Sequence, residues 1–205
     1  MRTAAHVLSV LLHPLWMPTL TIIICFGVDP HLSLYFDKDG LLIIYAMVFV
    51  MTALFPLTSA FMMVRNGLIS EFSMPERRER APAFILTLLY YCLCYYLLRR
   101  TPNHPVTLCI FLGATLALAT TLFITLRWKI SVHMVGIGGL LGALLAVMLL
   151  HNAFAPLALC ALLVLAGALG TARLLVSDHT PAQVYAGALL GSACVFGCAV
   201  LGVFV

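Results

Sequence analysis

Seven long apolar runs, separated by short polar turns, make up most of this 205-residue chain. Of all residues 63% are hydrophobic and only 9% are charged. A soluble domain cannot hide that much apolar surface, because roughly half apolar is the usual level. A bilayer can, and it requires every backbone group to be bonded internally, as in a helix of about 20 residues. The predicted spans are 6–28, 40–64, 82–98, 105–126, 133–151, 155–173 and 181–205.

The fold class predicted from these runs is an all-α polytopic membrane protein, with six or seven transmembrane helices in one bundle. Residues 1–205 are expected to form a single integral membrane domain. The helix count depends on the first span, in which "HPLWMP", from His13 to Pro18, holds two prolines. Prolines inside a helix bend or break it, and a re-entrant or surface-lying first segment would reduce the count to six.

The loops between the spans alternate between two sides of the membrane, here called side X and side Y. Side X receives the N-terminus and the turns 65–81, 127–132 and 173–180, so every polar cluster falls on it. Side X carries eight Lys and Arg residues against three on side Y, which taken plainly places X in the cytoplasm. If five of the eight belong to a site, the count is three against three and the orientation stays open.

The composition argues against several other classes of protein. The net charge of +4 comes from arginines scattered at helix ends rather than from a basic stripe, so nucleic acid is not expected as a partner. All seven cysteines lie inside apolar runs and are interpreted as small buried hydrophobes. The sequence offers no carboxylate cage for a divalent metal and no glycine-rich nucleotide loop, so neither a metal nor another cofactor is expected.

The first polar cluster is "MPERRERAP", residues 74–82, which contains Arg77, Arg78 and Arg80. One interpretation is a cytoplasmic anchor that interacts with anionic lipid head groups. The other is a group of guanidiniums that grips a phosphate, which arginine binds bidentately.

The second cluster lies between Arg127 and the glycine-rich span that follows it. Ser131 is predicted to cap that helix, and His133 lies in its first turn, where free N–H groups and the helix dipole favour an anion. Lys129 precedes both. Gly138 and Gly142 are predicted to allow close helix packing.

The third cluster joins the last two spans. Thr180-Pro181-Ala182-Gln183 predicts a helix start with a capping box between Thr180 and Gln183. Arg173 and His179 have no such structural explanation, and charged or titratable side chains at membrane depth are functional candidates by default. Together the clusters favour metal-free phosphate chemistry, in which cations hold the oxygens while one histidine attacks phosphorus and another protonates the leaving group.

With these residues the chain resembles the type 2 phosphatidic acid phosphatase superfamily of membrane lipid phosphatases, over roughly residues 74–191. The third motif of that family is Ser-Arg, five residues, His, three residues, Asp. This sequence has Ala172-Arg173, then His179, then Gln183. The second motif, Pro-Ser-Gly-His, corresponds to Ile130-Ser131-Val132-His133.

The first motif of the family, Lys, six residues, Arg-Pro, corresponds only to "ERRERAP". Arg80 and Pro82 match its end with one residue inserted, and Arg77 or Arg78 stands for the lysine.

The resemblance implies a role for each matching residue. His179 would be the nucleophile that becomes a phosphohistidine, and His133 the general acid that releases the alcohol. The expected phosphate ligands are Arg173, Ser131, Arg77, Arg78, Arg80 and Lys129. Substrates of the family are membrane lipid phosphates and polyprenyl phosphates or pyrophosphates, and the implied location is the inner membrane of a bacterium.

One departure from the family bears on the activity. The family aspartate orients the nucleophilic histidine and stabilises its charged form, whereas Gln183 can accept the ring N–H but supplies no negative charge. A slow enzyme, or one helped by the neighbouring Asp178, is therefore one hypothesis. A degenerate relative that binds or moves a lipid phosphate without cleaving it is the second, and a scaffold or transporter unrelated to phosphate is the third. Tyr90, Tyr91, Tyr95 and Tyr96 are interpreted as an interface belt, with a groove for a lipid tail as the alternative.

Overall fold

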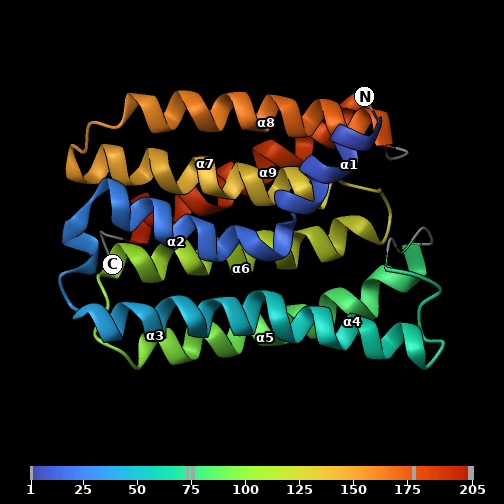
Figure 1. The fold of residues 1–205 in the computed structure, drawn as a ribbon, viewed down its shortest axis with the longest axis horizontal. Coiled ribbons are helices and arrows are strands. Elements are labelled where there is room, and N and C mark those ends of the chain that lie inside the picture. The colour runs from blue at the N-terminus through green and yellow to red at the C-terminus, as the bar shows by residue number, and fades with distance from the viewer. Residues whose placement is uncertain (1, 73, 75–76, 177–178, 203–205) are drawn as a thin grey trace.

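The computed structural model describes residues 2–72, 74, 77–176 and 179–202, all of them in helices, turns or short connections (Figure 1). Within this part of the chain, seven helical segments are long and apolar enough to cross a membrane. The chain is an integral membrane protein, and the predicted helical bundle is confirmed. The segments are Arg2–Val28, Lys38–Arg65, Arg78–Arg99, Pro105–Thr125, Val132–His151, Pro156–Val176 and Pro181–Gly202.

The first segment is broken, as its prolines predict. It consists of α1 (Arg2–Leu11), the 3-10 turn η1 (Pro14–Trp16) and α2 (Met17–Val28). Pro14 begins the turn and Pro18 lies in the first turn of α2. The indole N–H of Trp16 donates to the carbonyl of Val10 at 3.1 Å, which spans the break. The segment as a whole is still long and apolar enough to cross a membrane, so the described residues contain seven candidate spans rather than six.

The second segment contains a single turn of π-helix. Here α3 (Lys38–Phe49) continues through η3 (Val50–Leu54), the π-turn, into α4 (Phe55–Arg65). The N–H of Phe55 donates to the carbonyl of Val50, five residues earlier. Pro56 follows immediately, and a proline ring clashes with the carbonyl four residues before it, so the wider turn accommodates it.

The third segment begins earlier than its composition predicts. The polar stretch up to residue 81 was expected to be loop, but α5 runs over Arg77–Arg99 and includes the arginines in its first turns. A helix can continue beyond the apolar core because water or head groups solvate its charged side chains. Pro82 lies inside this helix, in its second turn, so the carbonyl of Arg78 four residues earlier receives no N–H from it. The turn to α6 (Pro105–Thr125) follows.

The centre of the bundle is the contact between α7 (Val132–His151) and α9 (Pro181–Gly202). An ideal Cβ built on Gly142 would fall 2.6 Å from the carbonyl oxygen of Ser192, and one on Gly138 would clash with Ala188. Glycine is therefore required for this approach, and the predicted packing role of Gly138 and Gly142 is confirmed. The remaining helix, α8 (Pro156–Val176), lies along α7. Helix α1 packs against the C-terminal half of α8 (Figure 1).

The two ends of the bundle carry different polar groups. The N-terminus and the connections α4–α5, α6–α7 and α8–α9 all lie at one end, which is side X (Figure 1). At the other end, the short turn η2 (Pro30–Ser33) follows α2, and the Asp29 carboxylate pairs with the ring of His151 and accepts the His31 N–H. Burial raises the pKa of Asp29, but these hydrogen bonds and the two histidines hold it below its usual value overall.

Candidate functional site

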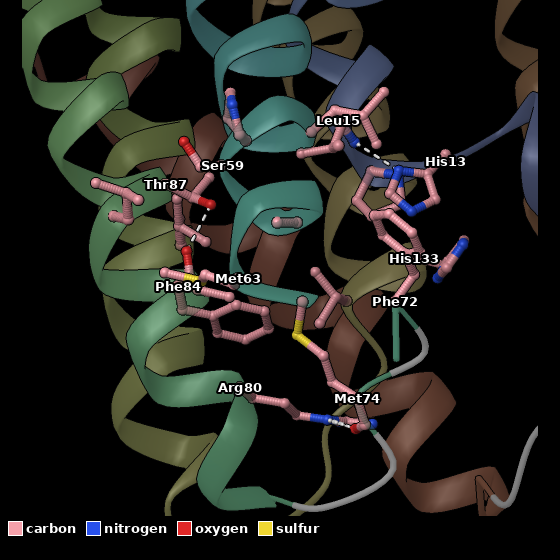
Figure 2. A pocket seen from close by; sticks show the side chains of 18 of the residues that line it. His13, Leu15, Ser59, Met63, Phe72, Met74, Arg80, Phe84, Thr87 and His133 are labelled. Atoms are coloured by element: carbon pink, nitrogen blue, oxygen red, sulfur yellow. Dashed lines mark hydrogen bonds between the residues drawn. The ribbon is translucent and has the colours of Figure 1, made fainter. Parts of the chain in front are cut away.

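A cavity of about 360 Å³ opens on side X, between the break in the first segment, α4 and α5. Figure 2 shows His13 and His133 close together on one wall, with Met63, Phe84 and Thr87 on the opposite wall and Arg80 at one end. Most of the lining is apolar. The charged or titratable residues of the lining are His13, Arg80, Tyr91, His133, Arg173 and His179.

Four residues that the sequence singled out thus line the same cavity, although more than 90 positions separate Arg80 from His179. Arg80 comes from the start of α5, His133 from the first turn of α7, Arg173 from the last turn of α8 and His179 from the residues before α9. Short connections on side X bring these helix ends together. The arrangement offers two guanidiniums and two imidazoles to one ligand.

His179 is held by the start of α9. Its Nδ1 lies 3.1 Å from Oε1 of Gln183, and the same oxygen accepts the backbone N–H of Thr180 at 3.0 Å. The Gln183 N–H lies 3.4 Å from Oγ1 of Thr180, so the predicted capping box is present. Because the Thr180 N–H identifies Oε1 as the acceptor, the ring nitrogen facing it must be the donor, which leaves the lone pair of a neutral His179 on Nε2.

The surroundings of His179 favour its neutral form. Burial is the main cause that lowers its pKa, and the nearby charges of Arg173, Lys129 and Arg80 lower it further. The hydrogen bond to Gln183 acts in the opposite direction, but the pKa stays below the usual value. A neutral imidazole with a free Nε2 is what nucleophilic attack requires.

His133 and Arg173 are both held by α1. His133 Nε2 lies 3.1 Å from the carbonyl oxygen of Ser9, and a carbonyl only accepts, so Nε2 carries the proton. Arg173 Nη1 donates to Oγ of the same Ser9 at 3.4 Å. The buried Ser9 therefore fixes the direction of two side chains of the site.

Arg80 is the most buried charged side chain of the cavity wall, 8% exposed. Its Nε donates to the carbonyl of Met74 at 3.0 Å, which aims the guanidinium along the cavity (Figure 2). Met74 adopts φ 45°, a left-handed conformation that is uncommon outside glycine. Glu79 accepts from the N–H and the hydroxyl of Ser70 at 2.8 and 3.0 Å, which ties the α4–α5 connection to the start of α5.

Of the other predicted phosphate ligands, those with a described side chain (Ser131, Arg78 and Lys129) are not part of the cavity lining. The Ser131 side chain is fully buried; it holds the N-cap position of α7 but makes no capping hydrogen bond, so that prediction is wrong. Its N–H instead donates to the carbonyl of Gln183 at 3.3 Å, joining the starts of α7 and α9. Arg78 is exposed, and Lys129 acts on His179 only through its charge. The side chain of Arg77 and all of Asp178 lie outside the described residues.

Sequence reasoning missed Ser9 and His13 and misjudged one tyrosine. Tyr91 is buried and lines the cavity rather than a membrane interface, and Tyr90 shares a hydrogen bond of 2.8 Å with Ser59. The signal for His13 was its place before a proline in a broken helix. No local pattern indicates Ser9, because its partners are more than 120 positions away.

Within the described part of the chain, the residues of the site neither form a metal-binding cluster nor take part in a disulfide bond. No cluster of three or more His, Cys, Asp or Glu side chains there could hold a metal ion. All seven cysteines are free thiols. No protein-family model, curated protein or solved structure matches the chain significantly.

Proposed function

We propose that this protein is a membrane phosphatase that hydrolyses a lipid or polyprenyl phosphate, either a monoester or a pyrophosphate, through a phosphohistidine on His179. The observation that carries the proposal is the meeting of Arg80, His133, Arg173 and His179 at one cavity whose remaining lining is mainly apolar. Two cations match the charge of a phosphate, and the apolar wall suits the hydrocarbon part of the same molecule.

In the first step, Nε2 of neutral His179 attacks phosphorus. The P–N bond forms as the P–O bond to the leaving group breaks. His133 enters this step as the imidazolium and transfers its Nδ1 proton to the leaving oxygen, so that the product is an alcohol, or a lipid monophosphate when the substrate is a pyrophosphate. Arg80 and Arg173 hold the other phosphoryl oxygens and stabilise the charge that develops on them.

In the second step, water attacks phosphorus of the phosphohistidine. His133, now neutral, accepts a proton from this water while the P–N bond breaks. Inorganic phosphate leaves and His179 returns to its starting tautomer, still hydrogen-bonded to Gln183. The two steps consume one water for each phosphate released.

The apolar wall supports a lipid substrate in preference to a water-soluble one. Pro56, Ser59, Ala60 and Met63 of α4 all line the cavity, at the spacing that places them on one face of a helix. Phe84 and Thr87 of α5 line the same wall, beside Met63 (Figure 2). A phosphate held by the arginines would leave its hydrocarbon chain beside this wall.

The second candidate is a protein that binds a lipid phosphate without cleaving it. The observation that favours it is Gln183, which orients His179 with a neutral oxygen and provides no negative charge for the imidazolium. In the serine protease triad, replacing the orienting aspartate by its amide lowers kcat about 10⁴-fold through the wrong tautomer. Here the acceptor oxygen faces His179, so the tautomer is the reactive one.

Phosphate release by the purified protein in detergent tests the proposal. Phosphatidic acid and a polyprenyl pyrophosphate are offered, and we expect release that His179→Ala abolishes. His6→Ala is the matched control, because His6 is an exposed histidine on α1. Binding without release in the wild type would favour the second candidate, and neither binding nor release would contradict both.

The location of the protein is part of the proposal. An integral membrane protein with a lipid phosphate as substrate fits the inner membrane of a bacterium. Fractionation of the membranes of a host that expresses the protein tests this.

A further inference from the structure

A third histidine adjoins the proposed catalytic pair. His13 lies at the break of the first segment, in extended conformation (φ −66°, ψ 139°), because the residue before a proline avoids the helical region. Its ring lines the cavity and stands edge-on to the ring of His133, with centroids 5.2 Å apart and planes at 82°. The break in the first segment therefore places the imidazole of His13 in the cavity, beside His133.

Hydrogen bonds determine which nitrogen of each ring carries the proton. The Leu15 N–H donates to Nδ1 of His13 at 3.3 Å, so neutral His13 carries its proton on Nε2. In their neutral forms His133 and His179 are arranged the other way, because each donates to a fixed oxygen and carries its lone pair on the other nitrogen. In His133 that nitrogen is the one that binds the proton for the leaving group. His13 is thus the neutral N–H donor of the three.

We infer that His13 binds the substrate by donating its Nε2–H to a phosphate oxygen on the leaving-group side, next to the proton that His133 delivers. The inference rests on the proposed function. The ring of His13 contacts the ring of His133, which serves the leaving group. A neutral donor adds a hydrogen bond there without adding a further positive charge beside Arg80 and Arg173.

Two substitutions separate this role from a purely structural one. His13→Asn keeps an oxygen that can accept the Leu15 N–H and so caps η1, but its side chain is too short to reach where Nε2 lies. His13→Gln carries an N–H to about that position but loses the cap. If His13 binds substrate, His13→Gln should keep its kcat/KM. If His13 only caps η1, His13→Asn should keep it.

The readouts are kcat/KM for lipid phosphate release and thermal stability in detergent. We expect His13→Asn to lose about 10- to 100-fold in kcat/KM at unchanged stability, the usual effect of losing a hydrogen bond to a charged group. We expect His13→Gln to be less stable but to keep kcat/KM within a few-fold of the wild type. Wild-type kcat/KM in His13→Asn, or equal losses in both variants, would overturn the inference.

A binding measurement distinguishes failure of this inference from failure of the proposed function. If the wild type releases no phosphate, the proposed function fails, and titration with dodecyl phosphate then tests His13. We expect the wild type and His13→Gln to bind it and His13→Asn to bind about 10-fold more weakly or worse. Equal binding by His13→Asn, or no binding by the wild type, would overturn the inference.

Discussion

Gln183→Glu is the substitution that tests the nucleophile most directly. A glutamate has the same length, so its carboxylate can accept both hydrogen bonds that Oε1 now accepts, from His179 at 3.1 Å and from Thr180 at 3.0 Å. Glutamate is also a preferred partner in a capping box at a helix start. The helix should therefore begin as before, and the main change is one negative charge beside the imidazole.

The sign and size of the effect follow from that charge. An opposite charge within hydrogen-bond distance stabilises the protonated ring and raises a histidine pKa by roughly 1–3 units. In the wild type the pKa of His179 lies below its usual value, so the reactive neutral form persists into acid. In Gln183→Glu the acid limb of kcat/KM should move to higher pH by roughly 1–3 units. Above this limb the variant should be faster, because the carboxylate stabilises the cationic ring that forms with the P–N bond.

The assay is phosphate release from phosphatidic acid between pH 4.5 and 9.5, with thermal unfolding as the control for folding. Gln183→Met is the matched variant, because it has similar length and no oxygen. It should lose about 1 kcal/mol of capping stability and up to about 10⁴-fold in kcat. An acid limb in Gln183→Glu that coincides with that of the wild type would refute the assignment of His179 as the nucleophile oriented by residue 183.

Three further predictions concern other parts of the bundle. Arg173→Lys keeps the charge but not the planar fork, and kcat/KM for lipid phosphate should fall about 10-fold or more; an unchanged value would remove this residue from the site. Gly142→Ala should lower the unfolding temperature, because its Cβ would fall 2.6 Å from a carbonyl of α9, whereas Gly167→Ala, with nothing within 4 Å, should not; equal effects would contradict the packing argument. Asp29→Ala should cost about 1–3 kcal/mol of stability through the lost η2 cap and the unpaired His151. Since the pKa of Asp29 is held below its usual value, the pH-dependent part of this contribution is present above about pH 4 and lost below it, which unfolding measured against pH will show.

The membrane segments could be predicted from the sequence because their signal is local. Each run of about 20 apolar residues is sufficient to identify a span, and the two prolines between His13 and Pro18 were sufficient to predict the break. The start of α5 was missed for the same reason. Charged residues indicate where the apolar core ends, and a helix such as the one carrying Arg80 continues beyond that point.

The site could be predicted only in part. The spacing of Arg173, His179 and Gln183 along the chain identified them as candidate site residues. The alternation of loops predicted that they lie on the same side of the membrane as His133. Ser9 could not be found this way, since its role depends on α1 packing against α8, a contact between the two ends of the chain. The N-cap position of Ser131 could be predicted, but not that its side chain would be fully buried without a capping hydrogen bond.

The π-turn at Val50–Leu54 sets which way the following helix faces. Relative to a regular α-helix, such a turn holds one extra residue, and each residue turns the helix by about 100°. Removing one residue from this turn would rotate α4 by about that angle and carry Ser59 and Met63 from the cavity toward the lipid. A one-residue deletion or insertion in this turn is thus a means by which related chains could exchange the α4 side of the cavity while α4 keeps its own length, hydrophobicity and place in the bundle.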